Sequence, residues 1–309
     1  MIDDKVLGAY AAVGTLPPAE QAQWYRKAAE EWGINIFEIP MLAGVAIAEE
    51  LVETFAELKS SLVVTMVAQW ATMGGENPDY GLSSVQPQWR QTSFVHACTV
   101  LQQCQVLHQK GIGIRNVEVH TGQRRGETVS HAIALYRSLV DLSEIVAEIL
   151  PDCGLTVEVT DNLPPDHPIP FPAAKKASLQ LSALSDVLRA VNQDAAGSVA
   201  LVVNWGRLLI NGDDPLEIVK GILAGDVPLA GAILSGAGPS PEGFRDSHNS
   251  HLDPHSGFTA QDAKACAEVL QQSKLSTFIG TKCGKTTRDG EVSAEEVLTA
   301  QAQLLGDIA

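Results

Sequence analysis

Residues 229–255 read LAGAILSGAGPSPEGFRDSHNSHLDPH, which joins an apolar run to a long polar segment. The first eight residues are typical of a strand that is buried on both faces. The rest shows neither helical nor strand periodicity, although it carries the chain's densest group of chemically capable side chains, including Asp246 and His248. Long loops inside compact domains are usually functional or disordered. Because Phe244 and Phe258 can anchor this one, we expect a folded active-site loop.

Similar apolar runs recur along the chain, separated by segments with the periodicity of amphipathic helices. The expected strands are residues 6–13, 34–41, 62–69, 114–121, 155–161, 199–205, 229–236 and 275–282. Eight strand–helix units predict one (β/α)8 TIM barrel that occupies residues 1–309. An open doubly wound sheet is the alternative. It is disfavoured because no G-x-G-x-x-G motif follows the first run and no reversal of strand order is evident.

The composition, 45% hydrophobic and 19% charged over 309 residues, is typical of a globular enzyme. A formal net charge of -16 argues against nucleic acid or an anionic membrane as a partner, because both require a basic surface. The N-terminus has no signal-peptide pattern and no apolar run suits a membrane span. The five cysteines lack metal-type spacing. We therefore expect a cytoplasmic protein with a small-molecule partner, and a homo-oligomer is an open alternative.

The loops that follow the strands build the active site of a TIM barrel. Three of these are predicted to be long, namely residues 70–86, 162–172 and 236–257. The first contains Trp70 and Tyr80 and is predicted to be a mobile lid with aromatic surfaces. The second is rich in proline and is predicted to be a rigid wall.

Polar residues occupy the ends of otherwise apolar strands, where burial costs free energy unless each group is paired. They are Glu38, Gln69, Glu118, His120, Glu158, Asp161, Asn204, Arg207, Ser235 and Lys282. A single such residue can be a satisfied structural pair. So many polar ends on converging strands indicate a functional site.

Glu158, Lys282 and His120 are the predicted catalytic residues. Glu158 can act as a base or a metal ligand. Lys282 can neutralise an oxyanion, and if Arg207 lowers its pKa it can form an imine; a structural ion pair with Glu158 is the alternative. His120 can move protons near neutral pH, or it can be a structural histidine bonded to Glu118 or a carbonyl.

The predicted substrate-binding residues are polar groups at the strand ends and aromatic rings that can pack on the apolar face of a sugar. They are Glu38, Gln69, Trp70, Asn204, Trp205, Arg207, Ser235, Asp246 and His248.

Four features together resemble the xylose-isomerase-like TIM barrels, the sugar isomerase and epimerase superfamily. They are Glu158, Asn204-Trp205-Gly206-Arg207, Ser235-Gly236 and Asp246-Ser247-His248. Within the superfamily, the chain is most similar over nearly its whole length to a bacterial branch catalogued as a domain of unknown function.

The resemblance implies a divalent metal bound by Glu, Asp, His and Glu on the fifth to eighth strands. Glu158 matches this pattern, whereas Asn204, Ser235 and Lys282 replace the other three ligands. Asn and Ser are poor metal ligands, and a lysine repels a cation. We therefore expect no metal at this position; if one binds, Glu158, Asp246 and His248 are the expected ligands.

The resemblance further implies a sugar or sugar-acid substrate. The first hypothesis is an isomerase, epimerase or lyase that uses Glu158 as acid/base and Lys282 as an electrostatic or imine-forming group. The second is a non-catalytic sugar-binding barrel. The third is a metal-dependent hydrolase or nuclease of the same superfamily, which the acidic composition disfavours where DNA is the substrate.

Overall fold

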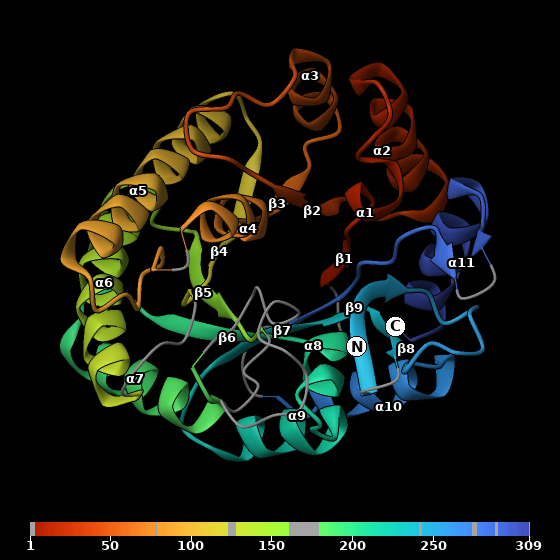
Figure 1. Ribbon diagram of the computed structural model, residues 1–309. Helices are drawn as coiled ribbons and strands as arrows, with labels where there is room; N and C mark the ends of the chain where they lie inside the picture. The colour runs from red at the N-terminus through yellow and green to blue at the C-terminus, as the bar shows by residue number, and fades with distance from the viewer. Residues whose placement is uncertain are drawn as a thin grey trace.

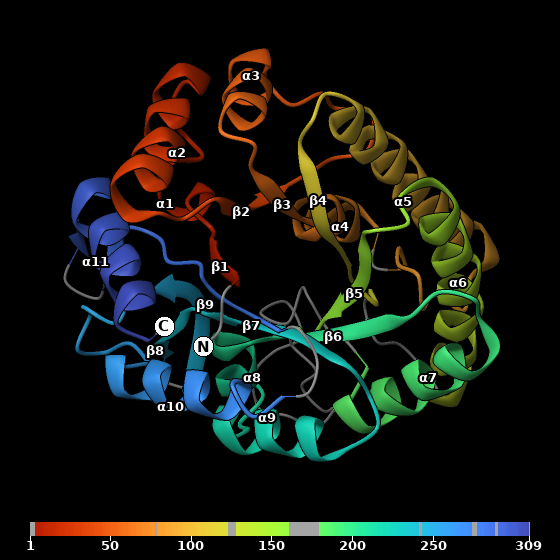
Figure 2. The same ribbon diagram turned by 180° about the vertical axis from the view of Figure 1, so that it is seen from behind.

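The computed structural model describes residues 4–77, 79–122, 128–160, 179–240, 243–273, 277–287 and 290–308. Eight parallel strands close into a barrel in the order β1–β10–β7–β6–β5–β4–β3–β2, and helices surround it (Figure 1, Figure 2). The strands are β1 (Asp4–Leu7), β2 (Ile36–Pro40), β3 (Ser61–Thr65), β4 (Gly113–Val119), β5 (Gly154–Glu158), β6 (Val199–Asn204), β7 (Leu229–Leu234) and β10 (Phe278–Thr281). The predicted (β/α)8 TIM barrel is therefore confirmed.

Helices follow the strands and form the outer layer of the fold. They are α1 (Tyr10–Val13), α2 (Pro18–Trp32), α3 (Glu49–Glu57), α4 (Val67–Glu76), α5 (Pro87–Gln109), α6 (Thr128–Ile149), α7 (Leu181–Asp194), α8 (Trp205–Ile210), α9 (Pro215–Ala224), α10 (Ala260–Leu270) and α11 (Ala294–Asp307). Two short pairs, β8 (Gly236–Ser240) with β9 (Gly243–Asn249) and β11 (Thr286–Thr287) with β12 (Gly290–Glu291), lie outside the barrel sheet. No helix in the described ranges combines the length and apolar character needed to cross a bilayer.

The first strand is shorter than predicted, because β1 ends at Leu7 and Tyr10–Val13 form helix α1 instead. Gly8 separates the two elements, and its amide donates to the Thr281 carbonyl at 2.8 Å. A Cβ atom at Gly8 would lie 3.0 Å from Cβ of Lys282. Glycine at this position therefore leaves room for the lysine stem.

The predicted lid after the third strand is also different, because most of its first half is the helix α4. Trp70 and Tyr80 are buried, with 4% and 2% of their surfaces exposed. The Tyr80 hydroxyl lies 3.0 Å from Nδ1 of His96, which joins this segment to α5. These rings are therefore part of the packed structure. The predicted proline-rich wall and Asp161 lie outside the described residues.

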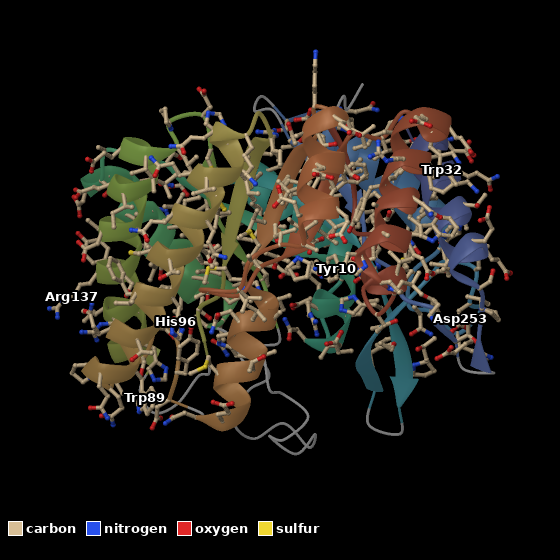
Figure 3. The ribbon with its side chains drawn as sticks, turned by 90° about the horizontal axis from the view of Figure 1, so that it is seen from above. Tyr10, Trp32, Trp89, His96, Arg137 and Asp253 are labelled. Carbon is tan, nitrogen blue, oxygen red and sulfur yellow. The ribbon has the colours of Figure 1, made fainter. Side chains whose placement is uncertain are left out.

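The segment after the seventh strand begins with an antiparallel hairpin, β8–β9, where we predicted no regular structure. A Cβ atom at Gly236 would lie 2.6 Å from the carbonyl oxygen of Asn249, so the two strands meet closely at the hairpin base. Figure 3 shows this hairpin and helix α4 at the same end of the barrel. The predicted active-site loop is thus folded, as a strand pair followed by turns.

The barrel interior changes from apolar to polar along its axis. Its apolar part consists of Val6, Val63, Val202, Ile233 and Phe278, while a larger core lies between strands and helices. Because side chains alternate along a strand, the inward positions beyond this cluster fall at the carboxyl ends of the strands. These positions hold Glu38, Glu118, Glu158, Asn204 and Lys282, all buried.

We expect Gly231→Ala to destabilise the barrel, because a methyl group there would lie 2.6 Å from Cγ of Phe278. Overpacking of this kind lowers the free energy of unfolding by about 1–3 kcal/mol. Gly75→Ala on α4 is the control, since no atom lies within 4 Å of the added Cβ. Urea denaturation should show the loss in the first variant alone. Equal stability of both variants would contradict this interior packing.

Candidate active site

A buried ammonium group lies between two carboxylates at the carboxyl ends of the barrel strands. Lys282, directly after β10, donates to Oε1 of Glu38 at 2.8 Å. Its Nζ also lies 3.5 Å from Oε1 of Glu158. At most 2% of each residue is exposed. The predicted proximity of Lys282 and Glu158 is present, but the shorter contact of the lysine is with Glu38.

A chain of hydrogen bonds extends from Glu158 across the sixth and seventh strands. Nδ2 of Asn204 donates to Oε1 of Glu158 at 2.9 Å, and the Ser235 hydroxyl donates to Oδ1 of Asn204 at 2.9 Å. The amide is therefore held in one orientation by a donor and an acceptor. At the positions where the resemblance implies metal ligands, this chain has a hydrogen-bonded network.

His120 contacts the other oxygen of Glu158, with 3.4 Å between Nε2 and Oε2. The ring of Trp70 meets it edge-on, with 6.3 Å between the ring centroids. The alternative hydrogen bond between His120 and Glu118 is not formed, because neither Glu118 oxygen has a hydrogen-bond partner among the described residues. The other two predicted catalytic residues, His120 and Lys282, thus both contact Glu158.

The charges in this group shift one another's pKa values. Burial alone would lower the pKa of Lys282, but the negative charges of Glu158 and Glu38 raise it well above its ordinary value. Burial opposes ionisation of Glu158, yet Lys282, His120 and Arg207 together lower its pKa to about 2. The prediction that Arg207 keeps the lysine pKa low is therefore wrong, because carboxylates dominate the surroundings of Lys282. A protonated lysine is not an imine-forming nucleophile.

The motif Asn204-Trp205-Gly206-Arg207 couples the barrel to the β8–β9 hairpin. A Cβ atom at Gly206 would lie 2.8 Å from the Ser235 carbonyl oxygen, so this turn requires the small residue. The following Arg207 is 2% exposed and contacts Oδ2 of Asp246 at 2.7 Å. His248 lies 3.3 Å from the other oxygen of Asp246. The predicted loop residues therefore reach the site through Arg207.

Two predicted substrate-binding residues make contacts away from Glu158. Oε1 of Gln69 accepts from the Ala43 amide at 2.8 Å, and its Nε2 lies 3.2 Å from Nδ1 of His96. Trp205 donates to the Gly257 carbonyl at 3.2 Å and packs in the outer core. It follows the inward-facing Asn204, so it points to the other side of the sheet.

One contact of the site, from Tyr10, was missed by the sequence analysis. Its hydroxyl donates to Oε1 of Glu38 at 3.0 Å, beside the bond from Lys282. We placed Tyr10 in the middle of the first strand, where it had no reason to stand out. The glycine at position 8 was the available signal that the strand ends before this tyrosine.

The site's donor set does not fit a divalent metal ion. Lys282 places a positive charge between Glu38 and Glu158, and Asn204 and Ser235 are bonded to each other. Within the described ranges, no three His, Cys, Asp or Glu side chains are grouped so that they could hold a metal ion. Asp246 instead pairs with both His248 and Arg207.

A family model described as "Domain of unknown function (DUF4862)" matches residues 6–295, from β1 into α11. The chain belongs to this family. The predicted resemblance to that branch is therefore confirmed. No curated protein matches the sequence.

Solved structures resemble this DUF4862 member over almost its whole length. AP endonuclease, family 2, from Brucella melitensis has a TM-score of 0.64 at 12% identity, covering 95% of this chain and 96% of its own. The IOLI protein with a bound zinc atom has a TM-score of 0.64 at 13% identity, covering 98% and 97%. L-ribulose 3-epimerase has a TM-score of 0.61 at 12% identity, covering 100% and 92%. At such identities the likeness shows the fold, a xylose-isomerase-like TIM barrel.

We expect Lys282→Met to destabilise the protein near neutral pH, because it leaves Glu38 and Glu158 buried without their cation. Breaking a buried ion pair typically costs about 3–5 kcal/mol. The double variant Lys282→Met/Glu38→Gln should regain part of this loss, measured by urea denaturation. Lys220→Met is the control, because Lys220 forms an exposed pair with Glu217. An unchanged free energy of unfolding for Lys282→Met would contradict the charged cluster.

We expect Glu158→Gln to flatten the acid limb of the stability profile. Glu158 titrates at about 2 in the folded chain and at about 4.3 when unfolded. Its ionised form therefore stabilises the fold above the unfolded pKa, and this stabilisation is lost as the pH falls toward the folded pKa. Between about pH 5 and about pH 3 the wild type should lose about 2 kcal/mol through this group. Identical slopes for the wild type and Glu158→Gln in urea titrations would show that this pKa is not lowered.

Proposed function

We propose that this protein is an enzyme acting on a sugar or sugar acid by proton transfer at a carbon next to a carbonyl group. The observation that carries the proposal is the buried Lys282, whose pKa the neighbouring carboxylates raise, beside Glu158 at the carboxyl ends of the strands. Active sites of TIM barrels occupy this end. Isomerisation and epimerisation both begin with such a proton transfer, and so does elimination by a lyase.

In the proposed mechanism Lys282 replaces the charge of a metal ion. Its ammonium group donates to the substrate carbonyl oxygen and stabilises negative charge that develops there. One donor placed at a developing oxyanion is worth about 3 kcal/mol, or roughly a hundredfold in rate. Because the ammonium is held by two carboxylates, it is positioned before the substrate arrives.

Glu158 is the proposed base that removes the proton from carbon. A carboxylate with a pKa of about 2 accepts a proton poorly. The charge of Lys282 is the strongest influence that lowers this pKa. When the ammonium group turns toward a substrate oxygen, this influence weakens and Glu158 becomes more basic. Substrate binding and activation of the base are thereby coupled.

The surrounding groups suit a substrate with several hydroxyls. Ser235, Asn204 and His120 offer donors and acceptors next to Glu158. The indole N–H of Trp70 is buried without an acceptor in the described part of the chain, and its ring meets His120. L-ribulose 3-epimerase shares this fold, so a barrel of this kind can act on a sugar.

A metal-dependent hydrolase or nuclease is less well supported. The likeness to AP endonuclease shows the fold only, and the net charge of -16 opposes binding of DNA. The donor set around Lys282 also does not fit a divalent metal.

We expect the protein to exchange substrate hydrogen for deuterium without added metal. Chelator-treated protein is incubated in D2O with ketoses, aldoses and uronates, and incorporation next to the carbonyl is followed by NMR. Lys282→Met should slow exchange roughly a hundredfold, because the oxyanion loses its donor, while Lys220→Met should not. Borohydride should trap no adduct on the protonated lysine. Binding of a sugar without exchange of any substrate would support a non-catalytic barrel.

A further inference from the structure

Glu118 is a buried carboxyl group at the polar end of the barrel. Its side chain is 0% exposed, and both oxygens lack a hydrogen-bond partner among the described residues. It lies on β4, on the same face as His120 two residues later. Its Cα pairs with Thr156, two residues before Glu158 on β5. Glu118 therefore lies one side chain deeper in the barrel than His120 and Glu158.

These surroundings favour the neutral acid. A carboxylate at this position would have no donor among the described residues and no solvent, and it would approach the negative charges of Glu38 and Glu158. Burial raises the pKa of Glu118 well above its ordinary value, and the charges of Glu38 and Glu158 raise it further, against the opposing effect of Lys282. An unsatisfied buried polar group costs about 1–3 kcal/mol. A leucine or methionine would avoid this cost, so the fold alone does not account for the glutamate.

The other two glutamates at this end of the barrel are already engaged. Oε1 of Glu38 accepts from both Tyr10 and Lys282, although burial raises the pKa of this carboxyl group. Glu158 accepts from Asn204 and contacts Lys282 and His120. Of these three carboxyl groups, Glu118 is therefore the one for which neither oxygen has a hydrogen-bond partner in the described part of the chain.

We propose that Glu118 is the catalytic acid of this site and gives its proton to the substrate carbonyl oxygen. The inference rests on the proposed function and makes it more specific. The substrate class is an α-hydroxy carbonyl compound, an aldose or ketose, that passes through a neutral enediol.

The step balances in atoms and charge. Glu158 takes the proton from the carbon next to the carbonyl, and the electron pair of that C–H bond forms the new C=C bond. The π pair of the carbonyl moves to its oxygen, which forms an O–H bond with the proton of Glu118. Glu158 ends neutral and Glu118 ends as the carboxylate. Return of a proton to either carbon of the enediol then gives the isomer, the epimer or the starting sugar.

This arrangement keeps the net charge of a buried site constant. Creating a new charge away from water is expensive. Here one carboxylate charge moves from Glu158 to Glu118, and the charge of Lys282 acts on both groups. The lysine charge thus stabilises the reactant, the transition state and the enediol, without a metal and without uptake of an ion.

Two variants of Glu118 test the proposal. Glu118→Gln retains the shape and removes the transferable proton, whereas Glu118→Met also removes the polar group and should fold at least as stably. Glu148→Gln, at an exposed position on α6, is the matched control. Infrared spectra of the proteins near neutral pH should show the C=O stretch of a buried neutral carboxylic acid in the wild type and in the control. The band should be absent in both Glu118 variants, and its persistence there would overturn the proposal.

Deuterium exchange into an aldose and a ketose provides the second readout. Loss of a general acid typically lowers the rate about 10²–10⁴-fold, so kcat for exchange should fall by at least about a hundredfold in Glu118→Gln, with little change in KM. If both Glu118 variants exchange deuterium at the wild-type rate, Glu118 is not the catalytic acid, and the proposed function still stands. Absence of exchange by the wild type with every sugar would overturn the proposed function, and this inference with it.

Discussion

The structure depends on one buried cation, the ammonium group of Lys282, among the carboxyl groups of Glu38, Glu118 and Glu158. Without it, three carboxyl groups would share a space that excludes water, and each negative charge would oppose ionisation of the other two. With it, the pKa of Glu158 falls, Glu38 bonds to the lysine although burial raises its pKa, and the pKa of Glu118 stays well above its ordinary value. The different surroundings of chemically identical side chains therefore give them different acidities.

The same cation can be compared with the metal ion of metal-dependent TIM barrels. A divalent ion and an ammonium group both place positive charge where a carbonyl oxygen becomes negative. An ion, however, needs several anionic or imidazole ligands, whereas a lysine needs hydrogen-bond acceptors and a channel for its stem. Glu38 and Glu158 are the acceptors here, and Asn204 and Ser235 hold Glu158 through hydrogen bonds. The hydrogen-bonded network therefore orients one of the two carboxylates that face the lysine.

The barrel and the polar ends of its strands could be predicted from the sequence because both depend on local patterns. Apolar runs of strand length identify the sheet, and a polar residue at the end of such a run must lie near the carboxyl edge. The direction of a side chain was harder to predict from the sequence. Trp205 follows Asn204 and so faces the helices, although both belong to one motif. The helical conformation of α4 and the hairpin β8–β9 depend on tertiary packing, such as the contact of Tyr80 with His96. The pKa values were the hardest property to predict, because the high pKa of Lys282 results from residues that are distant in the sequence.

The close approach of Gly8 and Lys282 has a consequence for the precision of the site. A Cβ atom at position 8 would lie 3.0 Å from Cβ of Lys282 and 3.1 Å from the Thr281 carbonyl oxygen. Even alanine there would press on the backbone and on the first atoms of the lysine side chain, and either must move to make room. The ammonium group at the far end of that side chain would then shift relative to Glu38 and Glu158. One missing methyl group next to β1 thus helps to fix the position of a charge that is anchored next to β10.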